Sequence, residues 1–219
     1  MRRLAGEGNF RVVESSSANV GAVILAAGSS SRMGSPKQAL QFRGASLLRR
    51  AALAALGAGC RPVIVVTGAH AELSRLEFEG LDVREALNTR WETGMASSVR
   101  AGVEALVDAD PDTAAAVFML CDQPHVTAEV IRGLVAAHLV TGRPVIASTY
   151  GESFGVPALF GRTLFAELAR LEGSSGAKEV IRSHAPEAHF LTFRGGEVDV
   201  DTPDDFSRLI AQDAGQERT

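Results

Sequence analysis

The sequence predicts an α/β fold with three layers, in which a mostly parallel, Rossmann-like sheet lies between two layers of helices. Apolar runs typical of buried strands alternate with segments of helical spacing, and this rhythm favours parallel strands joined by helices. Three of the runs, at 21–26, 63–67 and 114–121, are apolar over nearly their whole length. Because such strands are covered on both faces, we expect these three at the centre of the sheet.

The remaining elements follow from the same two patterns. Short apolar runs bounded by turn residues predict strands at 22–26, 61–67, 81–86, 114–121, 144–148, 157–160, 189–192 and 197–200. Helical spacing predicts helices at 46–57, 71–78, 95–107, 127–140, 164–171 and 177–183, and from 203 onwards. The last helix has a capping pattern, with Thr202 as the cap, Pro203 in the first position and Asp205 in the third.

Length and composition indicate one large domain. The 219 residues are 46% hydrophobic and 22% charged, and a domain of this size buries roughly 70% of its unfolded surface. No metal or disulfide is therefore needed to stabilise it. We expect a single domain at 20–210, preceded by a mobile extension or short extra strand at 1–19 and followed by a frayed polar tail at 211–219.

Charge, hydropathy and cysteine content argue against several classes of protein. The net charge of −4 argues against general nucleic-acid binding, and no apolar run approaches the roughly 18 residues that a membrane span needs. The first residues lack the apolar core of a signal peptide. Cys60 and Cys121 have neither C-x-x-C nor metal-ligand spacing, so they fit a cytoplasmic protein as small buried residues.

Residues 21–37, GAVILAAGSSSRMGSPK, hold the strongest functional signal. A buried strand opens here into a loop of glycines and serines that also carries Arg32 and Lys37. Gly28 lets backbone N–H groups approach an anion and the two cations add full charges, so the loop suits a polyphosphate. It is neither a P-loop, whose lysine directly follows the second glycine, nor a dinucleotide-binding G-x-G-x-x-G turn.

The choice of lysine at position 37 also indicates a chemical role. Of the 22 lysine and arginine residues, only Lys37 and Lys178 are lysine. A chain that otherwise uses arginine has a compact ammonium group at these two positions, either for function or through codon bias.

Two aspartates are candidates for holding a divalent cation beside the polyphosphate. Asp122 follows the most apolar strand, and the alternative role for it is capping its own turn. Asp201 lies at the end of the expected strand 197–200, on the same face as Glu197 and Asp199. Mg²⁺ prefers one or two carboxylates together with phosphate oxygens and water, so Asp122 is the first candidate ligand and Asp201 the second.

A helix N-terminus provides a further candidate site, for an anion or a polar base. Gly94 introduces this helix and the hydroxyls of Ser97 and Ser98 lie near its start, although the same residues also suit plain capping. Trp91, the only tryptophan, serves either as a packing anchor or as a stacking platform, and packing is the commoner role.

These motifs together resemble a known family. The spacing L-A-A-G-x-S-x-R-M-G-x-x-K, from Leu25 to Lys37, resembles the signature loop of MobA-like nucleotidyltransferases, and among them that of the molybdenum cofactor cytidylyltransferases. Later segments, in order, are similar to the family's N-x-x-W-x-x-G-M-x-S-S, D-x-P, G-x-P, G-D-x-G-A-R and D-x-D-T-P-x-D motifs. The chain departs from G-D-x-G-A-R, because Ser174 stands in place of Asp and Lys178 in place of Arg.

The resemblance implies a fold of the nucleotide-diphospho-sugar transferase type and nucleotidyl transfer, in which an acceptor phosphate attacks a nucleoside triphosphate and pyrophosphate leaves. It implies that Asp122 and Asp201 hold Mg²⁺ and that Arg32 and Lys37 neutralise the pyrophosphate; Arg32, Lys37 and Asp122 are the expected catalytic residues. The implied nucleotide contacts are Leu25, Ala26, Ala27, Gly28, Ser29, Arg32, Lys37, Thr67, Asn88, Gly94, Ser97 and Ser98. The implied acceptor contacts are Gln123, Pro124, Gly155, Pro157 and Lys178.

The resemblance also favours particular substrates. The loop begins L-A-A-G, as in the family's cytidine-using branch, and the β-carbon of Ala27 leaves less room for a purine. CTP is therefore the expected nucleotide and the molybdopterin cofactor the expected acceptor, with a molybdoenzyme or its chaperone as a partner. Methylerythritol phosphate or a sugar phosphate is an alternative acceptor. The altered residues 174 and 178 leave open a non-catalytic protein that delivers cofactor or nucleotide, whereas the missing dinucleotide turn argues against a Rossmann-type oxidoreductase.

Overall fold

The computed structural model describes residues 19–216, and in this part of the chain seven strands form one mixed sheet. Their order across the sheet is β5-β4-β1-β6-β8-β7-β9. Strand β8 runs antiparallel to its neighbours β6 and β7, and the other neighbouring pairs are parallel. The strands are β1 (Val20–Leu25), β4 (Val63–Thr67), β5 (Arg84–Leu87), β6 (Ala115–Leu120), β7 (Val145–Tyr150), β8 (Ser153–Gly161) and β9 (His189–Thr192).

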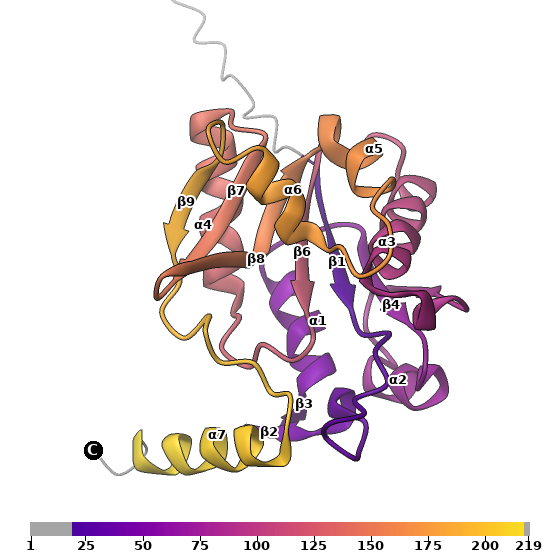
Figure 1. Cartoon of the computed structure of the whole chain (residues 1–219), viewed down its shortest axis with the longest axis vertical. Coiled ribbons are helices and arrows are strands. Elements are labelled where there is room, and N and C mark those ends of the chain that lie inside the picture. The colour runs from indigo at the N-terminus through magenta and orange to yellow at the C-terminus, as the bar shows by residue number, and fades with distance from the viewer. Residues whose placement is uncertain (1–18, 217–219) are drawn as a thin grey trace, which may run out of the picture.

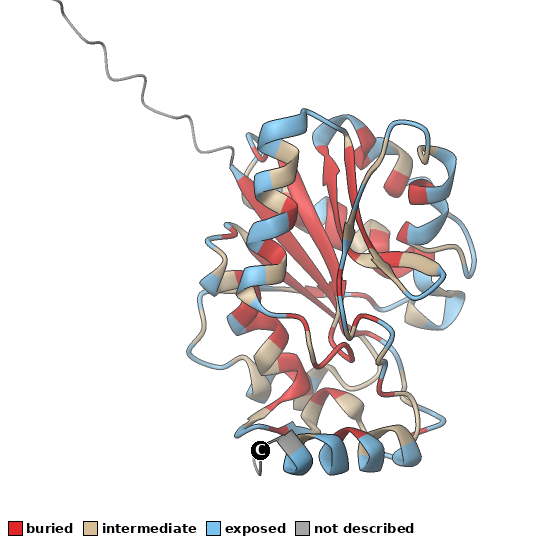
Figure 2. Ribbon diagram, turned by 90° about the vertical axis from the view of Figure 1, so that its left-hand side faces the viewer, coloured by how far each residue is buried: buried red, intermediate tan, exposed pale blue. Residues whose placement is uncertain are grey.

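Helices cover both faces of this sheet (Figure 1). Apolar residues of α1 and α4 pack on one face, and those of α3, α5 and α6 pack on the other. Figure 2 shows the strands between these layers as almost continuously buried. The helices are α1 (Leu47–Gly57), α2 (Ala71–Glu77), α3 (Met95–Ala109), α4 (Ala128–Thr141), α5 (Phe165–Leu168), α6 (Ala177–Ser183) and α7 (Pro203–Gln216). The predicted three-layer α/β fold with a mostly parallel sheet is confirmed.

The three most apolar strands lie side by side, as their composition predicts. Every residue of β1 is buried, and β1 pairs in parallel with β4 on one side and with β6 on the other. The register places Leu25 opposite both Val66 and Leu120, so the three strands end at the same edge of the sheet. The segments that follow β1 and β6 therefore emerge next to each other, where ligands of open α/β sheets bind.

Most predicted elements are present with shifted ends, and two predictions need correction. The helix expected at 164–171 is only a short 3₁₀ turn, Arg162–Leu164, followed by the single turn of α5. The strand expected at 197–200 is absent from the described structure. Gly195, with φ +87°, turns the chain out of the sheet after β9, and Val200 N instead donates to Asp122 O at 3.0 Å.

A small second layer covers the end of the sheet from which the β1 loop emerges. It contains a hairpin that the sequence analysis missed, β2 (Gln41–Phe42) and β3 (Ala45–Ser46), whose turn residues Arg43 and Gly44 both have positive φ. Helix α7 lies beside this hairpin (Figure 1), and apolar side chains of both enclose Val200. The cap predicted for α7 is confirmed, but the helix continues to Gln216, beyond the predicted start of a frayed tail at 211.

Two further findings concern membrane spans and the ends of the chain. No helix within residues 19–216 is both long and apolar enough to cross a membrane. The extension predicted at 1–19 lies almost entirely outside the described residues, as do the last three residues of the predicted tail.

Candidate functional site

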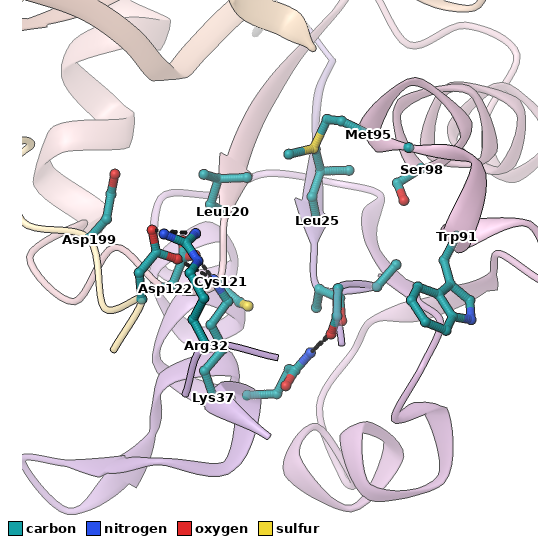
Figure 3. Close-up of a pocket in the computed structure, with 16 residues that line it drawn as sticks. Leu25, Arg32, Lys37, Trp91, Met95, Ser98, Leu120, Cys121, Asp122 and Asp199 are labelled. Atoms are coloured by element: carbon teal, nitrogen blue, oxygen red, sulfur yellow. Dashed lines mark hydrogen bonds and ion pairs between the residues drawn. The ribbon is translucent and has the colours of Figure 1, made fainter. Parts of the chain in front are cut away.

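A cavity of about 360 Å³ opens at the carboxyl edge of β1 and β6. Its walls come from the loop after β1, the residues that follow β6, the start of α3 and the segment that precedes α7. Figure 3 shows that the charged side chains gather at one end, whereas Trp91, Met95 and Ser98 lie at the other. The cavity therefore has a polyionic half and a less charged half.

Lys37 lies between two carboxylates at the charged end. Its Nζ donates a hydrogen bond to Asp122 Oδ2 and a second one, of 3.2 Å, to Asp201 Oδ1. Arg32 completes the group, because its guanidinium donates to Asp201 Oδ2 at 3.0 Å. The backbone hydrogen bond from Val200 to Asp122 holds the two acidic segments together. The predicted catalytic and metal-binding residues thus share one cavity.

The burial of this cluster decides its charge states. The side chains of Lys37 and Asp122 are 16% and 8% exposed. Burial alone lowers the pKa of Lys37, but the charge and hydrogen bond of Asp122, together with Asp201, outweigh it and hold the pKa above its ordinary value. Lys37 therefore stays an ammonium. Asp199 also lines the cavity, and burial, followed by the negative charges of Asp122 and Asp201, raises its pKa to about 6.

The two carboxylates fit a divalent cation that shares its coordination with a ligand. Asp122 Oδ1 is buried and has no hydrogen-bond partner among the described residues, which leaves an oxygen of a carboxylate free to coordinate. No three His, Cys, Asp or Glu side chains within residues 19–216 are grouped so as to hold a metal by themselves. This arrangement suits Mg²⁺, which combines one or two carboxylates with phosphate oxygens and water.

The loop after β1 adds backbone donors to the site. All the carbonyl oxygens of residues 26–30 accept hydrogen bonds from other parts of the protein. In contrast, the amide groups of residues 27–30 have no acceptor within the described structure. Free N–H groups next to Lys37 and Arg32 suit the oxygens of a polyphosphate.

The opposite end of the cavity is built on the start of α3. Trp91 begins a 3₁₀ turn, Trp91–Thr93, and packs against the core, as predicted for a packing anchor. It also lines the cavity, and its role as a stacking platform stays a prediction. The buried Asn88 amide donates to the hydroxyls of Ser97 at 2.8 Å and of Ser98 at 3.0 Å. This network fixes the first turn of α3 against β5.

A family model described as a MobA-like NTP transferase domain matches residues 22–188, which is most of the chain. The chain belongs to the MobA-like NTP transferase family. The predicted resemblance is confirmed, and the protein is a nucleotidyltransferase of this family. The matched region contains the β1 loop, Lys37 and Asp122, but it ends before Asp201.

Two relatives of known name are similar to this chain, one over about half of it and the other over most of it. Nicotine blue oxidoreductase of Paenarthrobacter nicotinovorans is 35% identical over 118 residues, which are 53% of this chain and 55% of that protein. The match thus spans about half the length of this relative. Purine catabolism protein PucB of Bacillus subtilis (strain 168) is 29% identical over 199 residues, 85% of this chain and 94% of that protein.

Solved structures share the whole fold. Rv0371c of Mycobacterium tuberculosis H37Rv is 32% identical, with a TM-score of 0.74 over 88% of this chain and 97% of that chain. A complex of Rv0371C with manganese is 31% identical, with a TM-score of 0.70 over 87% and 97%. A nucleotidyl transferase from Methanothermobacter thermautotroptrophicus, 24% identical with a TM-score of 0.74 over 87% and 95%, supports the fold alone.

The predicted nucleotide-binding residues fall into two groups in this family member. Those that line the cavity are Leu25, Ala26, Ala27, Gly28, Arg32, Lys37, Gly94 and Ser98. Ser29, Thr67, Asn88 and Ser97 do not line it. Thr67 is fully buried and its hydroxyl donates to Glu85 Oε1 at 2.6 Å, while Asn88 and Ser97 bond each other. A supporting role behind the cavity wall suits these three better than direct contact with a nucleotide.

The predicted acceptor-binding residues lie outside this cavity, and their role stays a prediction. They are Gln123, Pro124, Gly155, Pro157 and Lys178. Gln123 Nε2 donates to Val156 O at 3.1 Å. Lys178 Nζ donates to Ser153 Oγ at 2.9 Å and lies 5.4 Å from the centre of the Phe154 ring.

Several cavity residues were not predicted as site residues. They are Gln38, Trp91, Met95, Leu120, Cys121 and Asp199. Gln38 and Cys121 directly follow or precede predicted residues, which was the available signal, but their burial is a tertiary property. Burial raises the pKa of Cys121 to about 12, so this residue stays a thiol and agrees with its predicted role as an apolar filler.

Proposed function

We propose that this protein transfers CMP from CTP to a phosphorylated acceptor, with the molybdopterin cofactor as the first candidate acceptor. One observation carries the proposal: Lys37, Asp122 and Asp201 meet in a single cavity, beside a loop whose backbone N–H groups are unpaired within the described structure. An ammonium, two carboxylates and a row of amide donors together match the charges of a triphosphate and its cation.

The proposed step needs no nucleophile from the protein. An oxygen of the acceptor phosphate attacks the α-phosphorus of CTP, the bond from that phosphorus to the bridging oxygen breaks, and pyrophosphate leaves. The protein contributes alignment and charge neutralisation. Arg32 and Lys37 neutralise the leaving pyrophosphate, and the backbone of Ala27, Gly28 and Ser29 holds the phosphate oxygens and the base; of these three residues, Ala27 and Gly28 line the cavity.

Asp122 and Asp201 are the residues that would hold Mg²⁺. When bound, the cation would neutralise and polarise the phosphates of the nucleotide. The unpartnered Oδ1 of Asp122 and the manganese complex of Rv0371C support divalent metal use. Lys37 then serves to bind the phosphates, because its charge is retained at all physiological pH values.

The two ends of the cavity suggest where the substrates lie. Ala27 lines the cavity within the L-A-A-G sequence, which resembles that of the family's cytidine-using branch, and this resemblance favours CTP. The segment 173–176 belongs to the motif in which this chain differs from the family's G-D-x-G-A-R pattern, and it borders the Met95 end of the cavity. Ala96 N donates to Gly173 O at 3.2 Å, and a β-carbon on Gly176 would lie 3.2 Å from Met95 Cγ. We therefore place the acceptor towards this end. The free, buried cysteines fit a cytoplasmic reaction.

The test is pyrophosphate release from CTP, GTP, ATP and UTP, each with Mg²⁺ and with molybdopterin cofactor, methylerythritol phosphate or a sugar phosphate. We expect release with CTP and molybdopterin cofactor, and its loss on addition of EDTA. The Lys37→Ala variant should retain the fold but lose on the order of 10²-fold or more in turnover.

Two other outcomes would redirect the proposal. CTP binding without release for any acceptor would favour a delivery protein. NADPH oxidation is measured in parallel, because one relative is named nicotine blue oxidoreductase. Oxidation without pyrophosphate release would replace the proposed transfer.

A further inference from the structure

Gln38 is a polar side chain with no exposed surface, packed against the loop after β1. Its Nε2 donates to the carbonyl oxygens of Ala26 at 2.8 Å and of Gly28 at 3.0 Å, so both hydrogens of the amide group are used. Carbonyl oxygens can only accept, and these two contacts therefore decide which end of the Gln38 amide faces the loop.

The same two contacts set the direction of the backbone amides. In a trans peptide, the N–H of a residue points opposite to the carbonyl of the residue before it. The carbonyls of Ala26 and Gly28 point at Gln38, so the amides of Ala27 and Ser29 point away from it. Neither amide has an acceptor within residues 19–216. Both amides are thus left unengaged, and that of Ala27 belongs to the cavity wall, where a ligand can bind it.

The remaining carbonyls of the loop are held by the segment that precedes α2. Ala69 N donates to Ala27 O at 3.1 Å, and His70 Nε2 lies 3.0 Å from Ser29 O. Because Ser29 O can only accept, His70 carries its proton on Nε2. The amides of residues 27–29 are therefore available as hydrogen-bond donors, while the carbonyl oxygens of residues 26–29 are already engaged.

We propose that Gln38 is a positioning residue that sets nucleotide selectivity by making this loop a donor-only surface. The inference rests on the proposed function, because it requires the nucleotide to bind at this loop. On its Watson–Crick edge cytosine has two acceptors, O2 and N3, and one donor, its 4-amino group, whereas guanine has one acceptor, O6, and two donors, N1–H and its 2-amino group. Guanine therefore brings fewer acceptors to the loop amides and more donors that meet no free carbonyl of this loop, and unpaired donors at a binding site are costly.

The Gln38→Met variant keeps the length of the side chain and removes the donor. Isothermal titration calorimetry of CTP and of GTP, each with Mn²⁺, measures the ratio of the two affinities. We expect the variant to bind CTP about tenfold or more weakly, since two hydrogen bonds to the loop are lost, and to narrow the preference for CTP over GTP. General damage to the loop would weaken both nucleotides equally and leave the ratio unchanged.

Gln41→Met is the matched control. Gln41 is an exposed glutamine that also donates to a backbone carbonyl, that of Ala39 at 3.2 Å, but it does not line the cavity. This variant should bind both nucleotides as the wild type does. Should Gln38→Met fail to fold, His70→Ala frees only Ser29 O and should narrow the preference to a smaller extent.

The outcomes separate the two proposals. If the wild type binds CTP but folded Gln38→Met has an unchanged ratio of CTP to GTP affinity, the role of Gln38 is overturned and the proposed function stays intact. Where Gln38→Met does not fold, an unchanged ratio in His70→Ala has the same meaning. Failure of the wild type to bind any nucleotide overturns the proposed function, and this inference with it.

Discussion

Lys37 Nζ bonds Asp122, a carboxylate 85 positions away in the sequence, and the same ammonium reaches Asp201 at 3.2 Å. The lysine thus balances the two carboxylates that we propose as ligands of the divalent cation. A metal that joins these carboxylates and an ammonium that bonds both of them compete for the same negative charge. The nucleotide phosphates would resolve this competition, because they provide Lys37 with another anionic partner.

Replacing Lys37 by Met should therefore raise the affinity for Mn²⁺ in the absence of nucleotide. We expect a gain of about tenfold or more, because hydrogen bonds to charged groups contribute ~1.5–3 kcal/mol. Electron paramagnetic resonance of free Mn²⁺ measures the change. Lys178→Met removes the same charge at the only other lysine and should leave Mn²⁺ affinity unchanged. Equal Mn²⁺ affinity in wild type and Lys37→Met would contradict the competition.

Asp122→Asn should be more damaging than Asp201→Asn. The Asp122 side chain is 8% exposed and has a buried oxygen without a partner, whereas that of Asp201 is 34% exposed and is also bonded by Arg32. We expect turnover to fall on the order of 10²–10³-fold for Asp122→Asn and less for Asp201→Asn. Steady-state pyrophosphate release, together with Mn²⁺ affinity, tests this order. A larger loss from Asp201→Asn would mean that Asp201 is the main ligand.

Gly94→Ala should destabilise the protein at the contact between the start of α3 and the segment 173–176. Gly94 has a φ of +115°, and a β-carbon there would lie 2.2 Å from Gly173 O. We expect a loss of about 3 kcal/mol in the free energy of unfolding, measured by urea denaturation. Gly133→Ala is the control: it lies inside α4 with no atom within 4 Å of the added carbon, and it should stabilise by about 0.5–1 kcal/mol.

The cap of α7 should depend on pH through Asp205. Its carboxylate accepts hydrogen bonds from Thr202 N at 2.8 Å and from Thr202 Oγ1 at 2.7 Å, and these bonds, with that from Arg208, lower its pKa to about 2. Because the pKa of Asp205 in the folded state lies below its unfolded value near 3.8, the charged carboxylate stabilises the folded state at pH values above that unfolded pKa. This contribution disappears as the pH falls through about 2.

Thermal unfolding of the wild type and of Asp205→Asn, followed between pH 7 and pH 2, tests this dependence. The difference in midpoint should be constant above about pH 5, where the carboxylate is charged in both states, and should vanish towards pH 2. A difference that does not vary with pH would show that the cap depends on the shape of the side chain rather than on its charge.

The sequence predicted the elements that depend on local patterns. The apolar runs of β1, β4 and β6 gave the central strands, and the Thr202–Asp205 cap marked the start of α7. Patterns failed where distant contacts decide the structure. The alternation at 197–200 suggested a strand, yet the turn at Gly195 removes this segment from the sheet. The hairpin β2–β3 has strands of two residues, which are too short to give a period.

The candidate site shows the same division. Residue types and spacing were sufficient to select Lys37 and Asp122, because cations and acids that follow apolar strands are visible in a linear pattern. Asp201 was selected as the end of a strand that does not form, and the fold of the segment before α7 brings it to Lys37. Their common cavity, the burial that keeps Gln38 under the loop, and the position of Trp91 follow from the packing of segments far apart in the chain. Periodicity reports only on neighbours within a few residues, so long-range distances and the direction of each peptide group emerge once the whole chain has folded.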